Sequence, residues 1–151
     1  MGKRCCFAGH SKIYDNFQNR LKFEIEQLTM NNGVSEFWVG NYGAFDRTAA
    51  GIVRELKSVY HNIKLYLVLP YITKVIDKHR YQYYQEYDAM LMADIPDKTP
   101  IKYRIIKCNE YMVNECDFLI CYVKYSWGGA SRTLEYAKRK NHIEIINISD
   151  S

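Results

Sequence analysis

Short apolar runs alternate along this chain with segments in which apolar residues are spaced. A run of apolar residues predicts a strand buried on both faces, whereas apolar residues three or four positions apart predict an amphipathic helix. Five runs of the first kind predict strands at residues 4–8, 34–39, 63–69, 118–123 and 143–148. Helical segments separate these strands, and two of them lie between the third strand and the fourth.

The predicted helices differ in how clearly they begin. Asp15 and Gln18 resemble a capping box at the start of the first helix, and the carboxylate of Asp46 can cap the second. The apolar faces of these two helices comprise Phe17, Leu21, Ile25 and Leu28 in the first and Ala49, Ile52, Val53, Leu56 and Tyr60 in the second. Residues 81–91 and 102–116 predict two further helices, and a last helix ends near residue 140.

This alternation predicts an α/β fold with a Rossmann-like, doubly wound, mainly parallel five-stranded sheet that has helices on both faces. Right-handed crossovers favour the strand order 3-2-1-4-5. The point at which the strand order reverses then lies between the first and fourth strands. The loops that follow these strands, residues 9–11 and 124–131, therefore meet at the crevice where such sheets bind ligands.

A glycine-containing turn joins the fourth strand to the last helix. Its sequence is Trp127-Gly-Gly-Ala-Ser-Arg-Thr-Leu-Glu135. Two glycines let the backbone pass close to a ligand, and the free N–H groups at a helix start suit a phosphate. Ser131 is the expected N-cap of this helix. The alternative is a tight turn without a ligand, because a glycine pair alone is a weak motif.

Several polar side chains at the same rim can take part in a ligand site, and each has a plainer alternative. His10 can bond a phosphate or ribose, or be an exposed loop histidine. Asp46 can hold a ribose hydroxyl, cap its helix, or do both. Arg132 can pair with phosphate or be solvated. The predicted ligand-binding residues are Gly9, His10, Ser11, Gly40, Tyr42, Gly43, Asp46, Trp127, Gly128, Gly129, Ala130, Ser131 and Arg132.

Glu135 is the candidate catalytic residue. A carboxylate one turn into the last helix can bind ribose hydroxyls or assist attack at a glycosidic carbon. Its alternative role is a favourable interaction with the helix dipole. A base can stack on Tyr71, Tyr81, Tyr83 or Tyr84, although a tyrosine-rich helix more often serves packing or an oligomer contact.

Composition narrows the class of protein. The chain has 151 residues, 48% hydrophobic and 25% charged, which fits one domain spanning residues 1–151. No run is long enough to span a membrane and no signal-peptide core follows Met1, so we expect a cytoplasmic protein. The five cysteines favour buried reduced thiols, and neither their spacing nor the four scattered histidines predicts a metal site. We expect no cofactor. The net charge of +4 is spread among acids, so nucleic acid is an unlikely partner on this reasoning.

Five segments together resemble a known superfamily. They are Cys5-Cys-Phe-Ala-Gly-His10, Gly40-Asn-Tyr-Gly-Ala-Phe-Asp46, Leu67-Val-Leu-Pro70, Asn109-Glu-Tyr-Met-Val-Asn114 with Asp117, and Gly128-Gly-Ala-Ser-Arg-Thr-Leu-Glu-Tyr-Ala137. Their order resembles the SLOG superfamily, named for the Smf/DprA and lonely-guy (LOG) proteins, and in particular its small stand-alone bacterial and phage YspA/YpsA-like branch. The resemblance implies a Rossmann-like fold that binds nucleotides or derivatives such as ADP-ribose or NAD.

The resemblance also assigns roles within the glycine turn. LOG enzymes carry a P-G-G-x-G-T-x-x-E motif that holds phosphate and supplies a catalytic glutamate. Gly128, Gly129 and Glu135 match it, whereas Trp127, Ser131 and Arg132 stand where the motif has proline, glycine and threonine. The resemblance therefore implies a phosphate-binding loop more strongly than it implies hydrolysis.

These observations leave three hypotheses of different classes. The first is a cytosolic sensor or sequestering domain for a nucleotide-derived small molecule, with the phosphate at residues 128–132. The second is an N-glycosidase that acts on a nucleoside monophosphate or an NAD-like substrate through Glu135. The third is a DNA-associated protein. Because the chain stops directly after its last strand, a sensor is expected to act through a partner or as a homo-oligomer.

Overall fold

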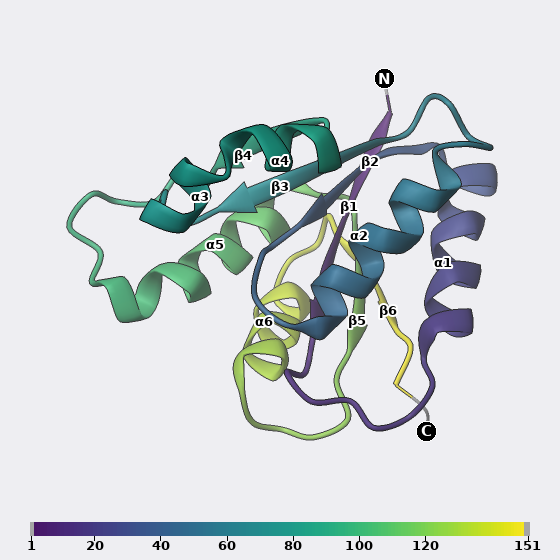
Figure 1. Cartoon of the computed structure of the whole chain (residues 1–151). Helices are drawn as coiled ribbons and strands as arrows, with labels where there is room; N and C mark the ends of the chain where they lie inside the picture. The colour runs from purple at the N-terminus through teal and green to yellow at the C-terminus, as the bar shows by residue number, and fades with distance from the viewer. Residues whose placement is uncertain (1, 150–151) are drawn as a thin grey trace.

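The protein is a six-stranded, all-parallel sheet with helices on both faces (Figure 1), and the computed structural model describes residues 2–149. The strand order is β4-β3-β2-β1-β5-β6. The strands are β1 (Lys3–Gly9), β2 (Val34–Val39), β3 (Lys64–Leu69), β4 (Ala89–Met92), β5 (Phe118–Tyr122) and β6 (Glu144–Asn147). The helices are α1 (Gln18–Asn31), α2 (Ala44–Leu56), α3 (Lys74–Lys78), α4 (Arg80–Glu86), α5 (Ile101–Glu115) and α6 (Gly129–Lys138). The predicted doubly wound fold and the relative order of its five strands are confirmed.

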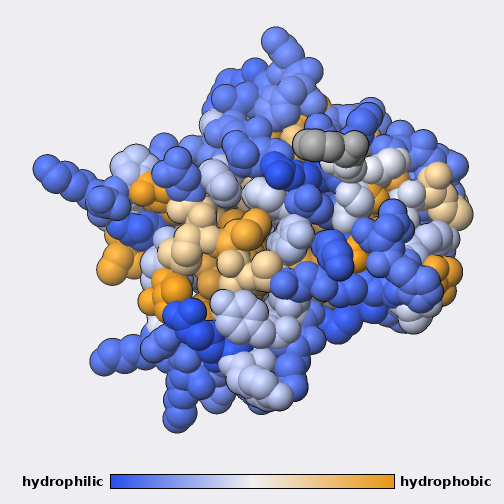
Figure 2. All heavy atoms as spheres, turned by 90° about the horizontal axis from the view of Figure 1, so that it is seen from above, coloured by the Kyte–Doolittle hydropathy of each residue, from blue (hydrophilic) through white to orange (hydrophobic). Residues whose placement is uncertain are grey.

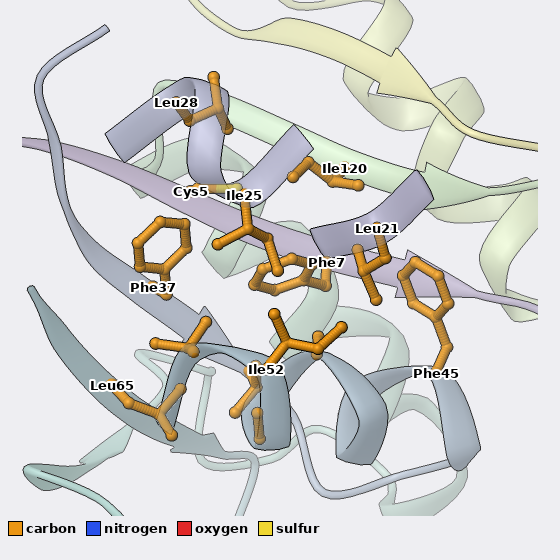
Figure 3. Close-up of a cluster of buried hydrophobic side chains, with 14 of the residues drawn as sticks. Cys5, Phe7, Leu21, Ile25, Leu28, Phe37, Phe45, Ile52, Leu65 and Ile120 are labelled. Carbon is orange, nitrogen blue, oxygen red and sulfur yellow. The ribbon is translucent and has the colours of Figure 1, made fainter. Parts of the chain in front are cut away.

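Two apolar layers sandwich the sheet, because side chains alternate along each strand. On β1, Cys5 and Phe7 join the layer formed with α1 and α2, whereas Cys6 and Ala8 join the layer formed with α5 and α6. Figure 3 shows the first layer, in which side chains of α1, α2 and the sheet point toward one another. Each large side chain buried there stabilises the fold by about 1.5–3 kcal/mol relative to exposure.

The prediction of one helix over residues 81–91 is wrong at its end. The helix α4 ends at Glu86, and residues 89–92 form the sixth strand, β4, which pairs in parallel with β3. Asp88 accounts for the change: its carboxylate accepts the N–H of Leu65 at 2.7 Å and pairs with Lys57. These contacts hold the chain beside β3 where a helix would have turned away.

The predicted capping box of the first helix is also wrong. The N-cap of α1 is Phe17, and no side chain caps this helix. Asp15 instead accepts hydrogen bonds from the hydroxyl of Tyr122 and, at 2.8 Å, from Arg20. Its carboxylate thus ties the loop after β1 to the end of β5.

The surface combines a hydrophilic exterior with an apolar patch. Figure 2 shows this patch on the side of the molecule that holds α3, α4 and β4 in Figure 1. The edge strand β4 has the sequence Ala-Met-Leu-Met, and Met92 is 49% exposed. Homo-oligomerisation stays a prediction. None of the helices within residues 2–149 combines the length and hydrophobicity that crossing a bilayer requires.

Candidate functional site

A cavity of about 310 Å³ lies at the carboxyl ends of β1 and β5, where the strand order reverses. We call it the switch pocket. It forms there because the chain leaves β1 toward α1 on one face of the sheet and leaves β5 toward α6 on the other. Its lining residues are Phe7, Ala8, Gly9, His10, Ser11, Tyr42, Asp46, Ile105, Asn109, Tyr125, Trp127, Gly128, Gly129 and Ala130.

Two helices begin at this pocket in the same manner. Gly128 is the N-cap of α6 with φ 93° and ψ 174°, and Gly43 is the N-cap of α2 with φ 110° and ψ 163°. Only glycine adopts this backbone region readily. Neither helix has a side-chain cap hydrogen bond. Their first N–H groups and positive dipole ends are therefore available to an anion.

The observed N-termini of α2 and α6 differ from the two predicted N-caps. Ser131 is not the N-cap of α6 but lies in its first turn, where it is buried. Asp46 does not cap α2 but is its third residue. The glycines replace them because the chain must turn sharply from the sheet into each helix, which requires the positive φ angles of Gly43 and Gly128.

A stack of three rings forms one wall of the pocket. His10 lies parallel to Tyr125 with 3.6 Å between ring centroids, and Tyr125 stacks on Trp127 at 4.3 Å. His10 is 4% exposed, and its Nε2 accepts the backbone N–H of Lys124 at 2.8 Å. Burial lowers the pKa of His10, which favours the neutral ring that this acceptor role requires. The stack ends in an indole that is 68% exposed.

His10 is not the exposed loop histidine of the plainer alternative, and its Nε2 is occupied by a backbone contact. A hydrogen bond from this residue to a phosphate or ribose stays a prediction. Its ring fixes the loop after β5 against the end of β1, so it supports the pocket while also lining it.

Asp46 and Tyr42 form part of the wall contributed by α2 and its preceding turn. Asp46 is partly exposed as a residue, but its Oδ1 atom is buried and has no hydrogen-bond partner within residues 2–149. Burial raises the pKa of Asp46 to about 7, against the opposing charge of Arg47. Burial and the neighbouring Tyr71 raise the pKa of Tyr42 to about 12. The wall therefore offers a carboxyl that can change charge near neutral pH.

Nine of the thirteen predicted binding residues line the switch pocket, and four do not: Gly40, Gly43, Ser131 and Arg132. A Cβ on Gly40 would lie 3.1 Å from Asp46 Oδ2, so Gly40 makes room behind the pocket wall. Arg132 is exposed on α6. Glu135 is also exposed, outside the lining, and pairs with Lys138 at 3.3 Å. Both residues keep their proposed roles only as predictions.

Sequence reasoning missed five lining residues: Phe7, Ala8, Ile105, Asn109 and Tyr125. Tyr125 lay inside the loop already singled out, and its spacing from Trp127 gave a signal. Ile105 and Asn109 come from α5, which gave no sign of reaching this edge of the sheet. Within residues 2–149, no three His, Cys, Asp or Glu side chains gather as metal ligands would.

Comparison with known proteins identifies the fold. No family model matches the chain, and no curated protein matches it by sequence. DNA processing protein A (DprA) from Streptococcus pneumoniae superposes with a TM-score of 0.68 at 16% identity, over 95% of this chain and 49% of that one. DprA from Helicobacter pylori gives a TM-score of 0.63 at 15% identity, over 91% and 61%. The chain therefore shares the Rossmann-like α/β fold of the matched parts of these two proteins, and it spans about half to three fifths of their length.

The second comparison corrects an expectation about partners. The Helicobacter pylori protein binds single-stranded DNA. Excluding nucleic acid because basic residues are dispersed along the sequence is therefore wrong, since a domain of this fold occurs in a DNA-binding protein. Dispersal along the chain says little about phosphate binding, because folding can bring distant arginines to one surface.

Proposed function

We propose that the switch pocket binds one nucleotide unit, supplied either by single-stranded DNA or by a free nucleotide-derived ligand such as ADP-ribose. The observation that carries this proposal is the exposed indole of Trp127 beside the start of α6. An aromatic face suits any base, and a helix N-terminus suits a phosphate. The two lie next to each other in sequence, so one nucleotide can contact both.

The phosphate is proposed to sit on the first N–H groups of α6, at residues 129–131. Gly128 leaves open space at its own Cβ position, so nothing obstructs the approach. The start of α2 lies at the same pocket and adds a second positive dipole end.

The sugar is proposed to face Asp46. The unpartnered Oδ1 of this residue can accept a hydrogen bond from a ribose hydroxyl of a free nucleotide or from the terminal sugar hydroxyl of a DNA strand, and a buried acceptor without a partner is unfavourable. Asn109 on α5 lines the same space and offers both a donor and an acceptor. These contacts fit a sugar without requiring cleavage of its glycosidic bond.

Binding is favoured over hydrolysis because Glu135, the proposed catalytic carboxylate, lines no part of the pocket and pairs with Lys138. A Glu135→Gln variant tests the alternative directly. If wild-type protein releases base from AMP or ADP-ribose and the variant does not, the pocket belongs to an N-glycosidase. Intact ligand after prolonged incubation with both proteins is the result expected here.

The binding test uses three ligands: a labelled six-nucleotide thymidine strand in fluorescence anisotropy, and AMP and ADP-ribose in calorimetry. Binding by the strand alone indicates DNA, and binding by a free nucleotide alone indicates a small-molecule ligand. Trp127→Ala should weaken whichever ligand binds by about 5- to 150-fold, the value of one stacked base.

Phe23→Ala is the matched control, since Phe23 is an aromatic residue on α1 that is 56% exposed and lies outside the pocket. We expect it to leave affinity unchanged. The proposal fails if folded wild-type protein binds none of the three ligands, or if the two variants behave alike.

A further inference from the structure

A second cavity, of about 370 Å³, lies between α2 and α4. Its chemistry comes from Arg47, Arg54, His79, Tyr83 and Glu86, and we call it the α2–α4 groove. The nucleotide site proposed above uses none of these side chains, and only Tyr83 among them also packs against the apolar core.

The arginines make the groove suited to anions. Arg47 and Arg54 lie seven residues apart, so they share one face of α2 at about 10 Å separation along the helix axis. Glu86 is the one carboxylate among the described lining residues, so two guanidinium groups outnumber it. His79 adds a ring donor, and Tyr83 adds an aromatic face.

The two arginines differ in how they are held. Arg54 donates from Nε to the backbone carbonyl of Glu86 at 3.0 Å and lies over the ring of Tyr87, 5.3 Å from its centroid. This guanidinium is therefore positioned before any ligand arrives. Arg47 is exposed at the end of the groove nearest the β2–α2 turn. Removing its charge should disturb the fold least.

The groove and the switch pocket meet at that turn. Asn41 lines the groove, and the next residue, Tyr42, lines the switch pocket. In the same way, Asp46 lines the switch pocket and the next residue, Arg47, lines the groove. The two sites are therefore neighbours at the start of α2.

We propose that the α2–α4 groove is a second anion subsite, which holds further phosphates of a single-stranded oligonucleotide whose first nucleotide occupies the switch pocket. This inference rests on the nucleotide site proposed above. The separation of the arginines favours successive phosphates of a strand over a pyrophosphate, whose two phosphorus atoms share one bridging oxygen. The base between those phosphates would face Tyr83.

The test compares the six-nucleotide thymidine strand with thymidine monophosphate for wild type, Arg47→Gln and Arg54→Gln. Each variant should bind the strand about fivefold more weakly, as expected for one exposed ion pair. Each should also lower the slope of log affinity against log salt by about 0.7, because one fewer phosphate is neutralised. Affinity for thymidine monophosphate should not change.

Arg80→Gln is the control, because it removes one charge from α4 at a residue that lies outside the groove and pairs with Asp77. The thermal midpoints of all variants are measured. If Arg54→Gln is less stable than wild type, the proposal is judged on the binding data for Arg47→Gln alone.

The outcomes separate the two proposals. If both ligands bind and Arg47→Gln changes neither affinity, the groove is not a subsite while the nucleotide site stands. An equal loss of affinity for the strand and for thymidine monophosphate also overturns the groove proposal, because Arg47 would then contribute to the switch pocket. Strand binding that resists Trp127→Ala but falls with Arg47→Gln would sink the nucleotide site instead.

Discussion

At the residue scale, Asp46 is expected to make stability depend on pH. Its pKa is about 7 in the folded protein, above its ordinary value of 3.8, because burial disfavours the charged form. Between these values the folded state binds a proton that the unfolded state releases. The contribution of Asp46 is therefore fully present below about pH 4 and is lost as pH rises through about 7.

Asp46→Asn removes this titration while keeping the shape of the side chain. The unfolding free energy of the variant minus that of wild type should be larger at about pH 8.5 than at about pH 5, by on the order of 2 kcal/mol. Denaturant unfolding of both proteins at the two pH values measures this difference. An unchanged difference would mean that Asp46 titrates as an exposed carboxylate.

Gly9 and Gly51 make opposite predictions for the same substitution. A Cβ on Gly9 would lie 2.6 Å from Cβ of Phe45, a buried residue of the core, so Gly9→Ala should cost about 1–3 kcal/mol. Gly51 is exposed within α2 and has open space at its Cβ position. Gly51→Ala should therefore gain about 0.5–1 kcal/mol through helix propensity. Thermal or urea unfolding of both variants measures these stability changes. Equal changes in the two variants would contradict the close approach of Gly9 to Phe45.

At this scale the sequence predicted which loops hold the pocket but not what each side chain does there. Gly9, Tyr42 and Trp127 line it as expected. The inward position of Ser131 could not be foreseen, because it depends on where α6 begins, and that start depends on the φ angle of Gly128. Asn109 was missed because its helix reaches the pocket only through the packing of α5 across the sheet.

At the scale of elements, the start of α6 depends on one backbone conformation. Gly128 has φ 93° and ψ 174°, a region that other residues occupy at a cost of about 1–3 kcal/mol. Gly128→Ala should lose that amount of stability together with nucleotide affinity. Gly129→Ala is the matched variant, because Gly129 is helical and has open space at its Cβ position. It should fold as well as wild type, and equal destabilisation of the two variants would remove the conformational argument.

The elements that sequence patterns predicted well are those with long, regular apolar spacing. α1, α2 and α5 each extend over three turns or more, and the apolar residues predicted within α1 and α2 from Leu21 to Leu28 and from Ala49 to Leu56 are buried. β4 was mistaken for helix because it has four residues and follows tyrosines whose spacing also fits a helix. Its pairing depends on Asp88 meeting Leu65 across the sheet, a contact between distant positions that local patterns do not encode.

At the scale of the whole molecule, the sheet explains why segments far apart in sequence share one site. β1 and β5 are neighbours although more than a hundred residues separate them, and their register pairs Gly9 with Tyr122. This pairing brings the loop that holds His10 beside the loop that holds Trp127. The predicted crossovers already implied this neighbourhood, so topology was the most informative prediction from sequence.

The global stability of the fold should also control the chemistry of its thiols. All five cysteines are buried, and burial raises the pKa of Cys108 and Cys121 to about 12. Because the thiolate is the reactive form, native protein should react slowly with a disulfide reagent near pH 8, whereas denatured protein should release all five thiols at once. Reaction progress followed by absorbance measures this, with Asn62→Cys as an exposed, fast-reacting control.

The same reaction then reports ligand binding without a label. If the thiols react only after global opening, a ligand that binds the folded state at about a hundred times its Kd should slow the reaction about a hundredfold. The Asn62→Cys thiol should keep its rate, because it needs no opening. A buried thiol that reacts as fast as this control would show that part of the core opens locally. Protection that disappears in Trp127→Ala would connect the ligand to the switch pocket through the stability of the entire fold.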